Sequence, residues 1–260
     1  MIDLSSIAHD VEPLVKEAGG LILEDWKTHN FHTKLKDVRD IVTDTDKTIE
    51  EFLRKKLYSI LPQAGFIVEE GTTDKQGEFN WTIDPIDGTK YFATDTPLFY
   101  TQVSLLRNGN PVIGFIYQPV SNQLFSAVQG RGAFLNQKKI SAPEKKGELK
   151  SAIVEFDMGS LSGEENKWKF SLIEQVCNLI YRPRFSSGYL TIYLATGAID
   201  ASINADFTLP YSIKNIVDIS PRSIILSEAG LIEKSVPVGK SSISIRSSAH
   251  LLRSLSSLFS

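Results

Sequence analysis

Apolar side chains recur at helical spacing in the first part of the chain. One set runs from Ile7 to Trp26, and a second runs from Ile49 to Ile60, just before Pro62. Apolar positions three and four residues apart share one face of a helix, and proline ends a helical pattern. The pattern therefore predicts two amphipathic helices separated by a polar connector.

The period of the pattern changes after residue 65. Short runs rich in β-branched and aromatic residues are typical of strands, and turn-forming residues separate these runs. The runs predicted as strands are 66–68, 81–83, 101–106, 112–117 and 124–128. Two helices followed by closely spaced strands predict a helix layer on a largely antiparallel sheet.

Beyond a polar run with Pro143 and Gly147, helical and strand patterns alternate. Strands are predicted at 152–156, 201–204 and 242–245, and helices at 167–180, 190–197, 219–229 and the C-terminus. Alternation of this kind indicates an α/β half. We therefore expect the mixed fold class α+β / α/β, with an N-terminal α+β half at 1–145 that carries most metal ligands. The C-terminal α/β half, 146–260, is expected to contribute Asp218 and the substrate pocket wall.

Composition narrows the class of protein. Hydrophobic residues make up 42% of the 260 residues and charged residues 23%, which excludes a disordered or fibrous chain. The single cysteine, Cys177, excludes a disulfide framework and a cysteine-based zinc or iron–sulfur site. The net charge of −3 offers no basic surface for a nucleic acid polymer or an anionic membrane. No apolar run approaches the ~18 residues of a membrane span, and the acidic N-terminal segment is unlike a signal peptide. We therefore expect a cytoplasmic protein.

Four acidic residues stand where predicted strands end. Glu69 and Glu70 follow one strand, and Asp84 and Asp87 follow the next. Residues at strand ends are well placed to converge in a cleft. Together with the backbone carbonyl of Ile86, these aspartates offer only oxygen ligands, a set that suits Mg²⁺.

Gly88 and Thr89 come directly after these acids. Their backbone N–H groups are unhindered, and a helix that begins there would present an anion site at its N-terminus. Oxygen ligands for a metal beside an anion pocket indicate phosphoryl chemistry. The alternative for the segment from Asp84 to Gly88 is a structural turn, because Asp-Pro and Asp-Gly are common turn dipeptides. The alternative for Glu69 and Glu70 is a solvated surface.

A third acidic cluster lies in residues 40–46. Asp44 and Asp46 precede a predicted helix, so either of them could instead cap it. The segment that begins at Asp40 has the length of an EF-hand loop but carries Thr45 where that loop needs glycine. No zinc-hydrolase histidine spacing, P-loop or Gly-x-Ser-x-Gly elbow occurs. Metal-dependent phosphoryl chemistry is the hypothesis that the residues favour.

The segment from Asp84 to Phe92 reads Asp-Pro-Ile-Asp-Gly-Thr-Lys-Tyr-Phe and matches the pattern DPIDGTxxF. That pattern is the signature of the inositol monophosphatase family, whose members are Mg²⁺-dependent, Li⁺-sensitive phosphatases. Four further segments resemble family segments in the same order: 40–46, 66–70, 130–136 and 218–230. The resemblance covers the chain from about residue 7 to about residue 230.

The resemblance implies a site for two to three Mg²⁺ ions. Glu69, Asp84 and the carbonyl of Ile86 would hold the first ion. Asp84, Asp87 and Asp218 would hold the second, and Glu69 with water would hold a weaker third.

The resemblance also implies catalytic and phosphate-binding residues. Asp46 and Thr89 would orient and activate the water that attacks phosphorus, with Glu70 beside the metal ligands. The N–H groups of Gly88 and Thr89 would bind the phosphate, and Lys36 would approach it from the polar connector.

Departures from the family pattern fall on the pocket wall. Tyr211 stands where inositol-specific members carry a glutamate, and Val217 stands where tryptophan is common. Ser186 and Ser187 lie in a segment that replaces the usual Gly-Ser/Thr-Ala turn. We expect Ser186, Ser187 and Tyr211 to contact the substrate.

The implied fold is a layered α-β-α-β-α sandwich of the inositol monophosphatase / fructose-1,6-bisphosphatase type, and the implied assembly is a homodimer. The implied substrate is a small-molecule phosphate ester, with an inositol monophosphate-like compound ranked first. A 3′(2′),5′-bisphosphate nucleotidase and a histidinol-phosphatase are alternatives within the family. A non-catalytic metal- and phosphate-binding module is the alternative from another class, against which the complete set of implied ligands argues.

Overall fold

The computed structural model describes residues 2–36, 41–74, 77–144, 149–159, 161–186, 188–205 and 213–259, the last range without the side chains of 213–215. The chain forms two compact units. Unit 1 contains Met1–Lys139 and Ser212–Glu228, and unit 2 contains Ile140–Tyr211 and Ala229–Ser260. The candidate functional residues at the strand ends all fall in unit 1.

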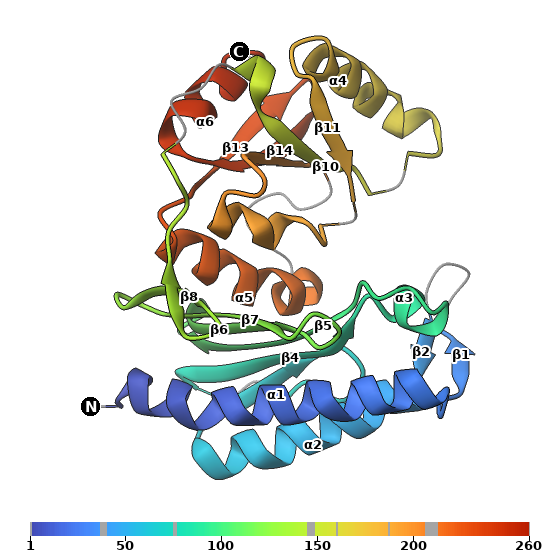
Figure 1. The fold of residues 1–260 in the computed structure, drawn as a ribbon, viewed down its shortest axis with the longest axis vertical. Coiled ribbons are helices and arrows are strands. Elements are labelled where there is room, and N and C mark those ends of the chain that lie inside the picture. The colour runs from blue at the N-terminus through green and yellow to red at the C-terminus, as the bar shows by residue number, and fades with distance from the viewer. Residues whose placement is uncertain are drawn as a thin grey trace. The chain divides into compact units, whose positions relative to one another are not determined.

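Unit 1 begins with a long helix that Asp3 caps, because its side chain accepts a hydrogen bond from the backbone N–H of Ser5 at 2.9 Å. Helices and strands then follow in the order that Figure 1 shows. The helices are α1 (Leu4–Thr28), α2 (Asp44–Ile60), α3 (Thr89–Ala93) and α5 (Ile213–Glu228). The strands are β1 (Thr33–Leu35), β2 (Ile41–Thr43), β3 (Gly65–Val68), β4 (Phe79–Asp87), β5 (Tyr100–Arg107), β6 (Asn110–Gln118), β7 (Gln123–Val128), β8 (Gly132–Leu135) and β9 (Lys138–Ile140).

The main sheet of unit 1 has seven strands in the order β3-β4-β5-β6-β7-β8-β9. β3 pairs with β4 in parallel, and the pairs from β4 to β8 are antiparallel. The prediction of a largely antiparallel sheet is therefore confirmed. β1 and β2 form a separate antiparallel pair within the segment that includes the predicted polar connector.

Helices cover both faces of this sheet, with α1 and α2 on one face and α5 on the other (Figure 1). Both α1 and α5 approach β6 closely. A Cβ on Gly19 of α1 would lie 2.4 Å from the ring of Tyr117, and a Cβ on Gly114 of β6 would lie 2.8 Å from the carbonyl oxygen of Pro221 on α5. Glycine at these two positions lets each helix pack directly on the strand.

α5 is also bonded to the sheet at its C-terminal end. Glu228 accepts hydrogen bonds from the backbone N–H groups of Gly130, in the turn after β7, and of Gly132, at the start of β8, both at 2.8 Å. α5, which carries Asp218, thus belongs to unit 1. This division differs from the predicted one, in which residues 146–260 form a half that contributes Asp218, because α5 packs on the sheet of unit 1.

Unit 2 is built on a mixed sheet of five strands in the order β11-β10-β12-β14-β13. β10 pairs in parallel with β11 and β12, and β14 pairs antiparallel with β12 and β13. The strands are β10 (Ile153–Asp157), β11 (Arg182–Phe185), β12 (Ala201–Asn204), β13 (Ile232–Val238) and β14 (Ser241–Ser247). The helices are α4 (Lys167–Cys177) and α6 (Ala249–Ser256), with short 3₁₀ helices η1 (Leu149–Ser151), η2 (Glu164–Asn166) and η3 (Thr191–Thr196).

Some local predictions for the second half of the chain were wrong. The helix expected at 190–197 is the 3₁₀ helix η3, which ends at Gly197 in the left-handed conformation. The helix expected to begin at 219 already begins at Ile213. Mixed sheets with flanking helices confirm the predicted mixed α and β class. None of the helices in the described parts of the chain is both long and apolar enough to span a membrane.

Candidate metal centre

The parallel pairing of β3 with β4 brings two acidic segments together. Val68, the last residue of β3, lies opposite Ile83 of β4. The backbone N–H of Glu69 donates to the carbonyl oxygen of Ile83 at 3.3 Å. Glu69 therefore leaves β3 beside Asp84, as expected for acids placed at the ends of neighbouring strands.

β4 changes register directly after Asp84. Asp84 lies opposite Gln102 of β5, whereas Asp87 lies opposite Tyr100. Two residues of β4 thus face one residue of β5, which is the arrangement of a β-bulge. Gly88 follows in the left-handed conformation, with φ of 96°, and α3 begins at Thr89. The bulge turns the backbone out of the sheet where the predicted ligands lie.

Asp218 reaches this region because three buried hydroxyl groups join α5 to the sheet. The hydroxyl of Ser220 lies 2.7 Å from that of Ser104 on β5 and 3.1 Å from that of Thr82 on β4. Thr82 and Ser104 are themselves 2.7 Å apart and face each other in the strand register. Ser220 is two residues from Asp218, so this triangle of hydroxyls determines where Asp218 is placed.

One carboxylate oxygen from each of Glu69, Asp84 and Asp218 lies within 4.8 Å of the other two. Asp84 is buried, and its Oδ1 has no hydrogen-bond partner among the described residues. A buried acceptor without a partner costs about 1–3 kcal/mol or more when it is charged. Mg²⁺ binds oxygen ligands at about 2.0–2.1 Å, so a small adjustment would bring all three oxygens onto one ion. The three carboxylates fit a divalent cation.

Burial raises the pKa values of these three acids. It raises the pKa of Glu69 to about 7, that of Asp218 to about 8, and that of Asp84 well above its ordinary value. Repulsion between neighbouring carboxylates adds to each of these pKa increases. A bound cation would relieve this repulsion, so the electrostatics of the cluster agree with its geometry.

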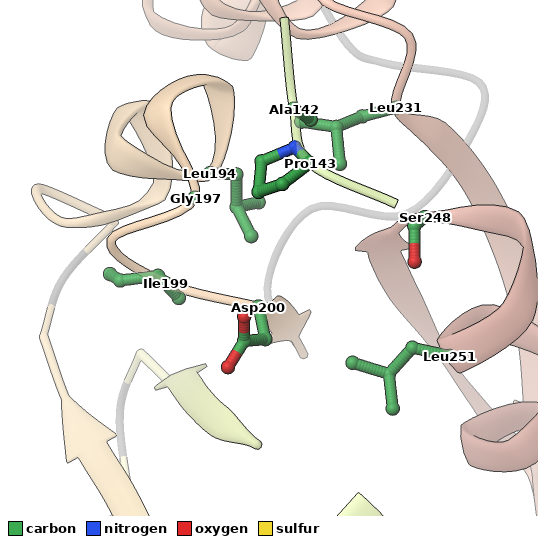
Figure 2. A pocket seen from close by; sticks show the side chains of 9 residues that line it. All are labelled: Ala142, Pro143, Leu194, Gly197, Ile199, Asp200, Leu231, Ser248 and Leu251. Carbon is green, nitrogen blue, oxygen red and sulfur yellow. The ribbon is translucent and has the colours of Figure 1, made fainter. Parts of the chain in front are cut away.

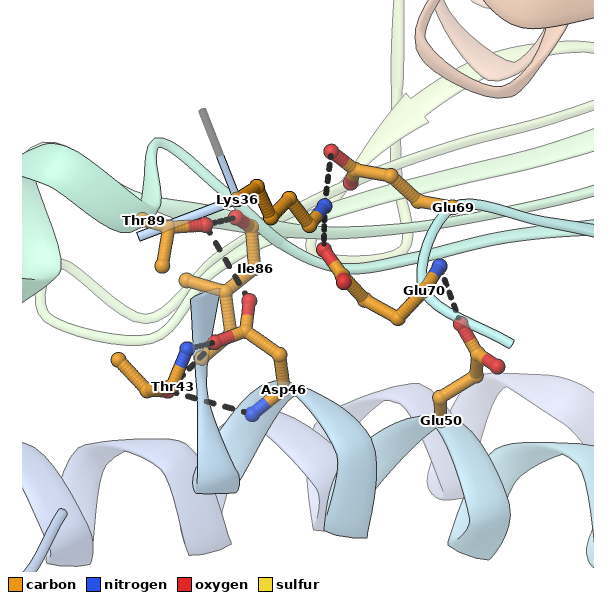
Figure 3. A network of polar contacts seen from close by, with 8 residues as sticks. All are labelled: Lys36, Thr43, Asp46, Glu50, Glu69, Glu70, Ile86 and Thr89. Carbon is orange, nitrogen blue, oxygen red and sulfur yellow. Dashed lines mark hydrogen bonds and ion pairs between the residues drawn. The ribbon is translucent and has the colours of Figure 1, made fainter. Parts of the chain in front are cut away.

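Asp46 is held in the first turn of α2 by a capping box. Thr43 is the N-cap. Oδ2 of Asp46 accepts one hydrogen bond from the backbone N–H of Thr43 at 2.8 Å and another from the hydroxyl of Thr43 at 2.5 Å. The other carboxylate oxygen, Oδ1, lies 3.2 Å from the hydroxyl of Thr89, which is also 2.9 Å from the carbonyl oxygen of Ile86 (Figure 3). Burial raises the pKa of Asp46 to about 6. Asp46 thus takes part in capping α2 and also reaches Thr89, whereas Asp44 accepts hydrogen bonds from His32.

Lys36 lies against the two adjacent glutamates. Its amine forms an ion pair with Glu70 and lies 3.7 Å from Oε1 of Glu69 (Figure 3). The side chain of Glu70 is 4% exposed, and its backbone N–H donates to Oε2 of Glu50 at 2.9 Å. Lys36 therefore offsets part of the negative charge of the cluster.

Asp87 is bound by a different set of partners from the other predicted ligands. Its Oδ2 accepts a hydrogen bond from the side-chain amide of Gln102. The guanidinium of Arg222, on α5, lies with Nη2 3.6 Å from the same oxygen. Among the described residues, the three-carboxylate group does not include Asp87.

The predicted pocket-wall residues belong to unit 2. The hydroxyl of Ser186 donates to the buried carboxylate of Glu155, which also accepts from Thr191 at 2.6 Å. Ser187 and Tyr211 lie outside the described residues. The roles expected for these three residues, and for the N–H groups of Gly88 and Thr89, stay predictions.

A cavity in unit 2 is too small for a metabolite. Its volume is about 10 Å³, enough for about one water molecule, and its lining is mostly apolar (Figure 2). Asp200 is one of its polar residues, and its carboxylate accepts a hydrogen bond from the backbone N–H of Ile153 at 2.8 Å. This cavity is therefore not a substrate site.

Sequence reasoning missed several residues that build the site, among them Glu50, Gln102, Arg222 and Ser220. Each is a polar residue on the inward face of a helix or strand. Ser220 and Arg222 are buried within α5, Gln102 is buried in β5, and Glu50 is buried in α2. A search for polar residues at buried positions of the predicted strands and helices would have found all four.

The model of the inositol monophosphatase family matches residues 3–239. The inositol monophosphatase of Dictyostelium discoideum is 36% identical over 164 residues, which cover 61% of this chain and 59% of that protein. Inositol monophosphatase 2 of Solanum lycopersicum is 31% identical over 230 residues, which cover 83% of this chain and 82% of that protein.

Solved structures show the same fold over nearly the whole chain. The extragenic suppressor protein suhB from Bartonella henselae aligns with a TM-score of 0.85 at 22% identity and covers 98% of both chains. A staphylococcal IMPase-I complexed with products aligns with a TM-score of 0.80 at 20% identity, covering 99% of this chain and 96% of that one. The predicted fold type is therefore confirmed.

Proposed function

Because the chain belongs to the inositol monophosphatase family and is a phosphoric monoester hydrolase, we propose that it releases phosphate from a small phosphorylated polyol with Mg²⁺ as cofactor. The observation that carries this proposal is the group formed by Glu69, Asp84 and Asp218. Three carboxylate oxygens converge there, and one buried oxygen of Asp84 has no partner among the described residues. Oxygen-only ligands of this kind suit Mg²⁺ better than zinc or copper.

Glu69, Asp84 and Asp218 would hold the ion, and the carbonyl of Ile86 would adjoin it as a further oxygen donor. When bound, Mg²⁺ supplies Lewis-acid stabilisation of the charge that develops on the phosphoryl and leaving-group oxygens. The chain's own residues must then position the attacking water and take up its proton.

Thr89 and Asp46 are arranged for that proton transfer. The Thr89 hydroxyl lies 3.2 Å from Oδ1 of Asp46 and can donate its proton to that oxygen while it accepts one from the attacking water. The water oxygen forms a bond to phosphorus, and the bond from phosphorus to the ester oxygen breaks, so that the ester oxygen leaves with the bonding electron pair and takes up a proton from solvent. With its pKa raised to about 6, Asp46 is close to the pKa that suits a base at neutral pH.

Lys36 and Glu70 would maintain the charge balance of the pocket. The amine of Lys36 lies between the carboxylates of Glu69 and Glu70, so a phosphate close to Glu69 would also lie close to a cation. A positive group at this place stabilises the negative charge of the phosphoryl group. The N–H groups of Gly88 and Thr89 are the other proposed phosphate donors.

Names of relatives support an inositol monophosphate-like substrate. Two relatives are an inositol-1-monophosphatase of Rhizobium meliloti, 28% identical over 231 residues that cover 84% of it, and a fructose-1,6-bisphosphatase/inositol-1-monophosphatase of Aquifex aeolicus, 28% identical over 227 residues that cover 83% of it. Both names refer to phosphorylated polyols or sugars. Polyol phosphates therefore rank above nucleotide and histidinol phosphates for this chain.

A panel of substrates tests the proposal. Phosphate release would be measured from inositol 1-phosphate, fructose 1,6-bisphosphate, adenosine 3′,5′-bisphosphate and histidinol phosphate, each with Mg²⁺, with EDTA and with added Li⁺. We expect Mg²⁺-dependent release that favours the inositol ester by about tenfold or more, which is about 1.4 kcal/mol in the transition state. If another compound of the panel is preferred, that compound becomes the proposed substrate, and the proposed Mg²⁺-dependent hydrolysis stands.

Absence of release from every compound, in a protein that binds Mg²⁺, would support a non-catalytic binding module instead. The proposed homodimer is tested separately, by measuring the molar mass of the protein in solution by light scattering. A monomeric mass would contradict it.

A further inference from the structure

Arg222 lies beside the candidate metal centre, where it faces Asp87. Its side chain is 8% exposed, and Nη2 lies 3.6 Å from Oδ2 of Asp87. Asp87 is one of the carboxylates expected to hold a second ion, yet this oxygen is already occupied by Arg222 and by the amide of Gln102. A positive group therefore already lies against the carboxylate that is expected to hold that ion.

The position of Arg222 on α5 relates it directly to the other ligands. It follows Asp218 by four residues, and side chains spaced by four lie one above the other on a helix. Burial raises the pKa of both Asp87 and Asp218, and the positive charge of Arg222 offsets part of each rise. The guanidinium thus acts on the two carboxylates that an ion between them would share.

Arg222 has little freedom to withdraw. The preceding residue, Pro221, packs so closely on β6 that a Cβ on Gly114 would lie 2.8 Å from its carbonyl oxygen. Ser220 is bonded to Ser104 and Thr82 in the sheet. These contacts of Pro221 and Ser220 hold the backbone next to Arg222. Only rotation of the Arg222 side chain could therefore move its charge away from Asp87.

The charge itself is permanent. A guanidinium is not deprotonated in proteins, unlike a lysine amine or a histidine ring. An incoming dication must either bind next to this positive group or displace it, and displacement would leave a buried arginine without its carboxylate partner. Breaking a buried pair in this way is strongly unfavourable.

We propose that Arg222 takes the place of a second divalent cation beside Asp87, so that one ion binds tightly at Glu69, Asp84 and Asp218. This inference rests on the proposed function and differs from the two to three ions that the family resemblance implies. The built-in charge would perform for Asp87 the neutralising role that a metal performs at an all-carboxylate site. Arg222 is thereby a residue that sets metal number and not a ligand.

Metal counting tests the inference without reference to turnover. Mn²⁺ is the probe, and its free concentration is followed by electron paramagnetic resonance during titration of the metal-free protein. Arg222→Met removes the charge and keeps a chain of similar length, Arg222→Lys keeps a positive charge, and Arg253→Met is the matched control at an exposed position of α6. Thermal unfolding monitored by circular dichroism establishes that each variant is folded.

The expected result is one tightly bound Mn²⁺ per chain in the unsubstituted protein, in Arg222→Lys and in Arg253→Met. Arg222→Met is expected to bind a second Mn²⁺ at least about tenfold more tightly than the unsubstituted protein does, a difference of about 1.4 kcal/mol. If Arg222→Met does not fold, Asp87→Asn provides the test, because loss of Asp87 should leave the tight ion in place.

Two tight ions in the unsubstituted protein would overturn the inference, as would an unchanged count in Arg222→Met or loss of the tight ion in Asp87→Asn. In each of these cases the unsubstituted protein still binds an ion, which agrees with the proposed function. Absence of any bound Mn²⁺ in the unsubstituted protein would instead overturn the proposed function and the inference together.

Discussion

The carboxylate of Glu50 on α2 holds the backbone of Glu70, whose N–H donates to Oε2 at 2.9 Å (Figure 3). The N–H of Gly71 bonds to the same carboxylate. A Cβ on Gly71 would lie 2.2 Å from Oε1 of Glu50, so glycine allows this close approach. Glu50 therefore fixes the segment that presents Glu69 to the metal centre.

Replacing Glu50 by alanine should weaken metal binding more than it weakens the fold. Groups that orient metal ligands typically contribute about 10- to 100-fold to metal affinity, and we expect a rise in the Mg²⁺ activation constant within that range. Glu50→Gln retains an oxygen acceptor of the same shape and should recover most of the affinity. Glu51→Ala, at the exposed neighbouring position, is the control, and equal activation constants for Glu50→Ala and Glu51→Ala would refute the role.

The acid limb of the pH profile should report Asp46. Its pKa is raised to about 6, mainly by burial, while the hydrogen bonds from Thr43 act in the opposite direction. Asp46 must be ionised to accept a proton, so kcat at saturating Mg²⁺ should fall as the pH drops below about 6. Thr43→Val removes the donated hydroxyl, and we expect the acid limb to move to higher pH.

The control for Thr43→Val is Thr48→Val, because the hydroxyl of Thr48 donates to a backbone carbonyl of the same helix, that of Asp44, at 3.0 Å. Its profile should match that of the unsubstituted protein. An acid limb that stays in place in Thr43→Val would show that another group limits the rate.

The metal-free protein should lose stability as the pH rises. The folded-state pKa values of Glu69 and Asp218 are raised to about 7 and about 8, mainly by burial, so the folded state holds protons that the unfolded chain has already released. The free energy of unfolding therefore falls between about pH 4 and about pH 8. Bound Mg²⁺ removes the repulsion, so the gain in Tm on adding Mg²⁺ should be larger at high pH.

Differential scanning calorimetry at about pH 5.5 and about pH 8.5, with EDTA or with excess Mg²⁺, measures this gain. For a chain of this size, 1 kcal/mol corresponds to roughly 2–4 °C in Tm. A gain in Tm that is the same at both pH values would contradict the assignment of the raised pKa values to the metal ligands.

The hydroxyl triangle of Thr82, Ser104 and Ser220 should contribute to both stability and metal affinity. Ser220→Ala leaves two buried hydroxyls with one partner fewer, at a cost of about 1–3 kcal/mol, and releases the turn of α5 that carries Asp218. Urea denaturation measures the first effect and Mn²⁺ titration the second. Ser227→Ala, at an exposed position of the same helix, is the control and should change neither quantity. Unchanged metal affinity in Ser220→Ala would show that the hydroxyl triangle does not position Asp218.

Two of the three clustered ligands could be recognised from local sequence. Glu69 and Asp84 end or interrupt apolar strand runs, and the parallel pairing of β3 with β4 then brings them together. Asp218 carries no such local signal, because it lies within a helix far along the chain. Only the family resemblance placed it near the others.

The elements that the sequence did not predict have weak local patterns for physical reasons. β11 reads Arg-Pro-Arg-Phe and lies at an edge of its sheet, where proline and charged residues are tolerated because no further strand pairs there. β13 is also an edge strand and is largely exposed. The roles of Arg222 and Glu50 depend on contacts between elements distant in sequence, which periodicity does not encode.

The central claim is that the Glu69, Asp84 and Asp218 cluster binds the metal that drives ester hydrolysis. Asp84→Asn tests it most directly, with Asp10→Asn at an exposed position of α1 as the matched control. We measure Mg²⁺-dependent phosphate release from inositol 1-phosphate together with Tm. The account predicts a loss of at least about 10²-fold in kcat for Asp84→Asn, with an unchanged or higher Tm because repulsion in the cluster is relieved. Phosphate release by Asp84→Asn at the rate of Asp10→Asn would contradict the account.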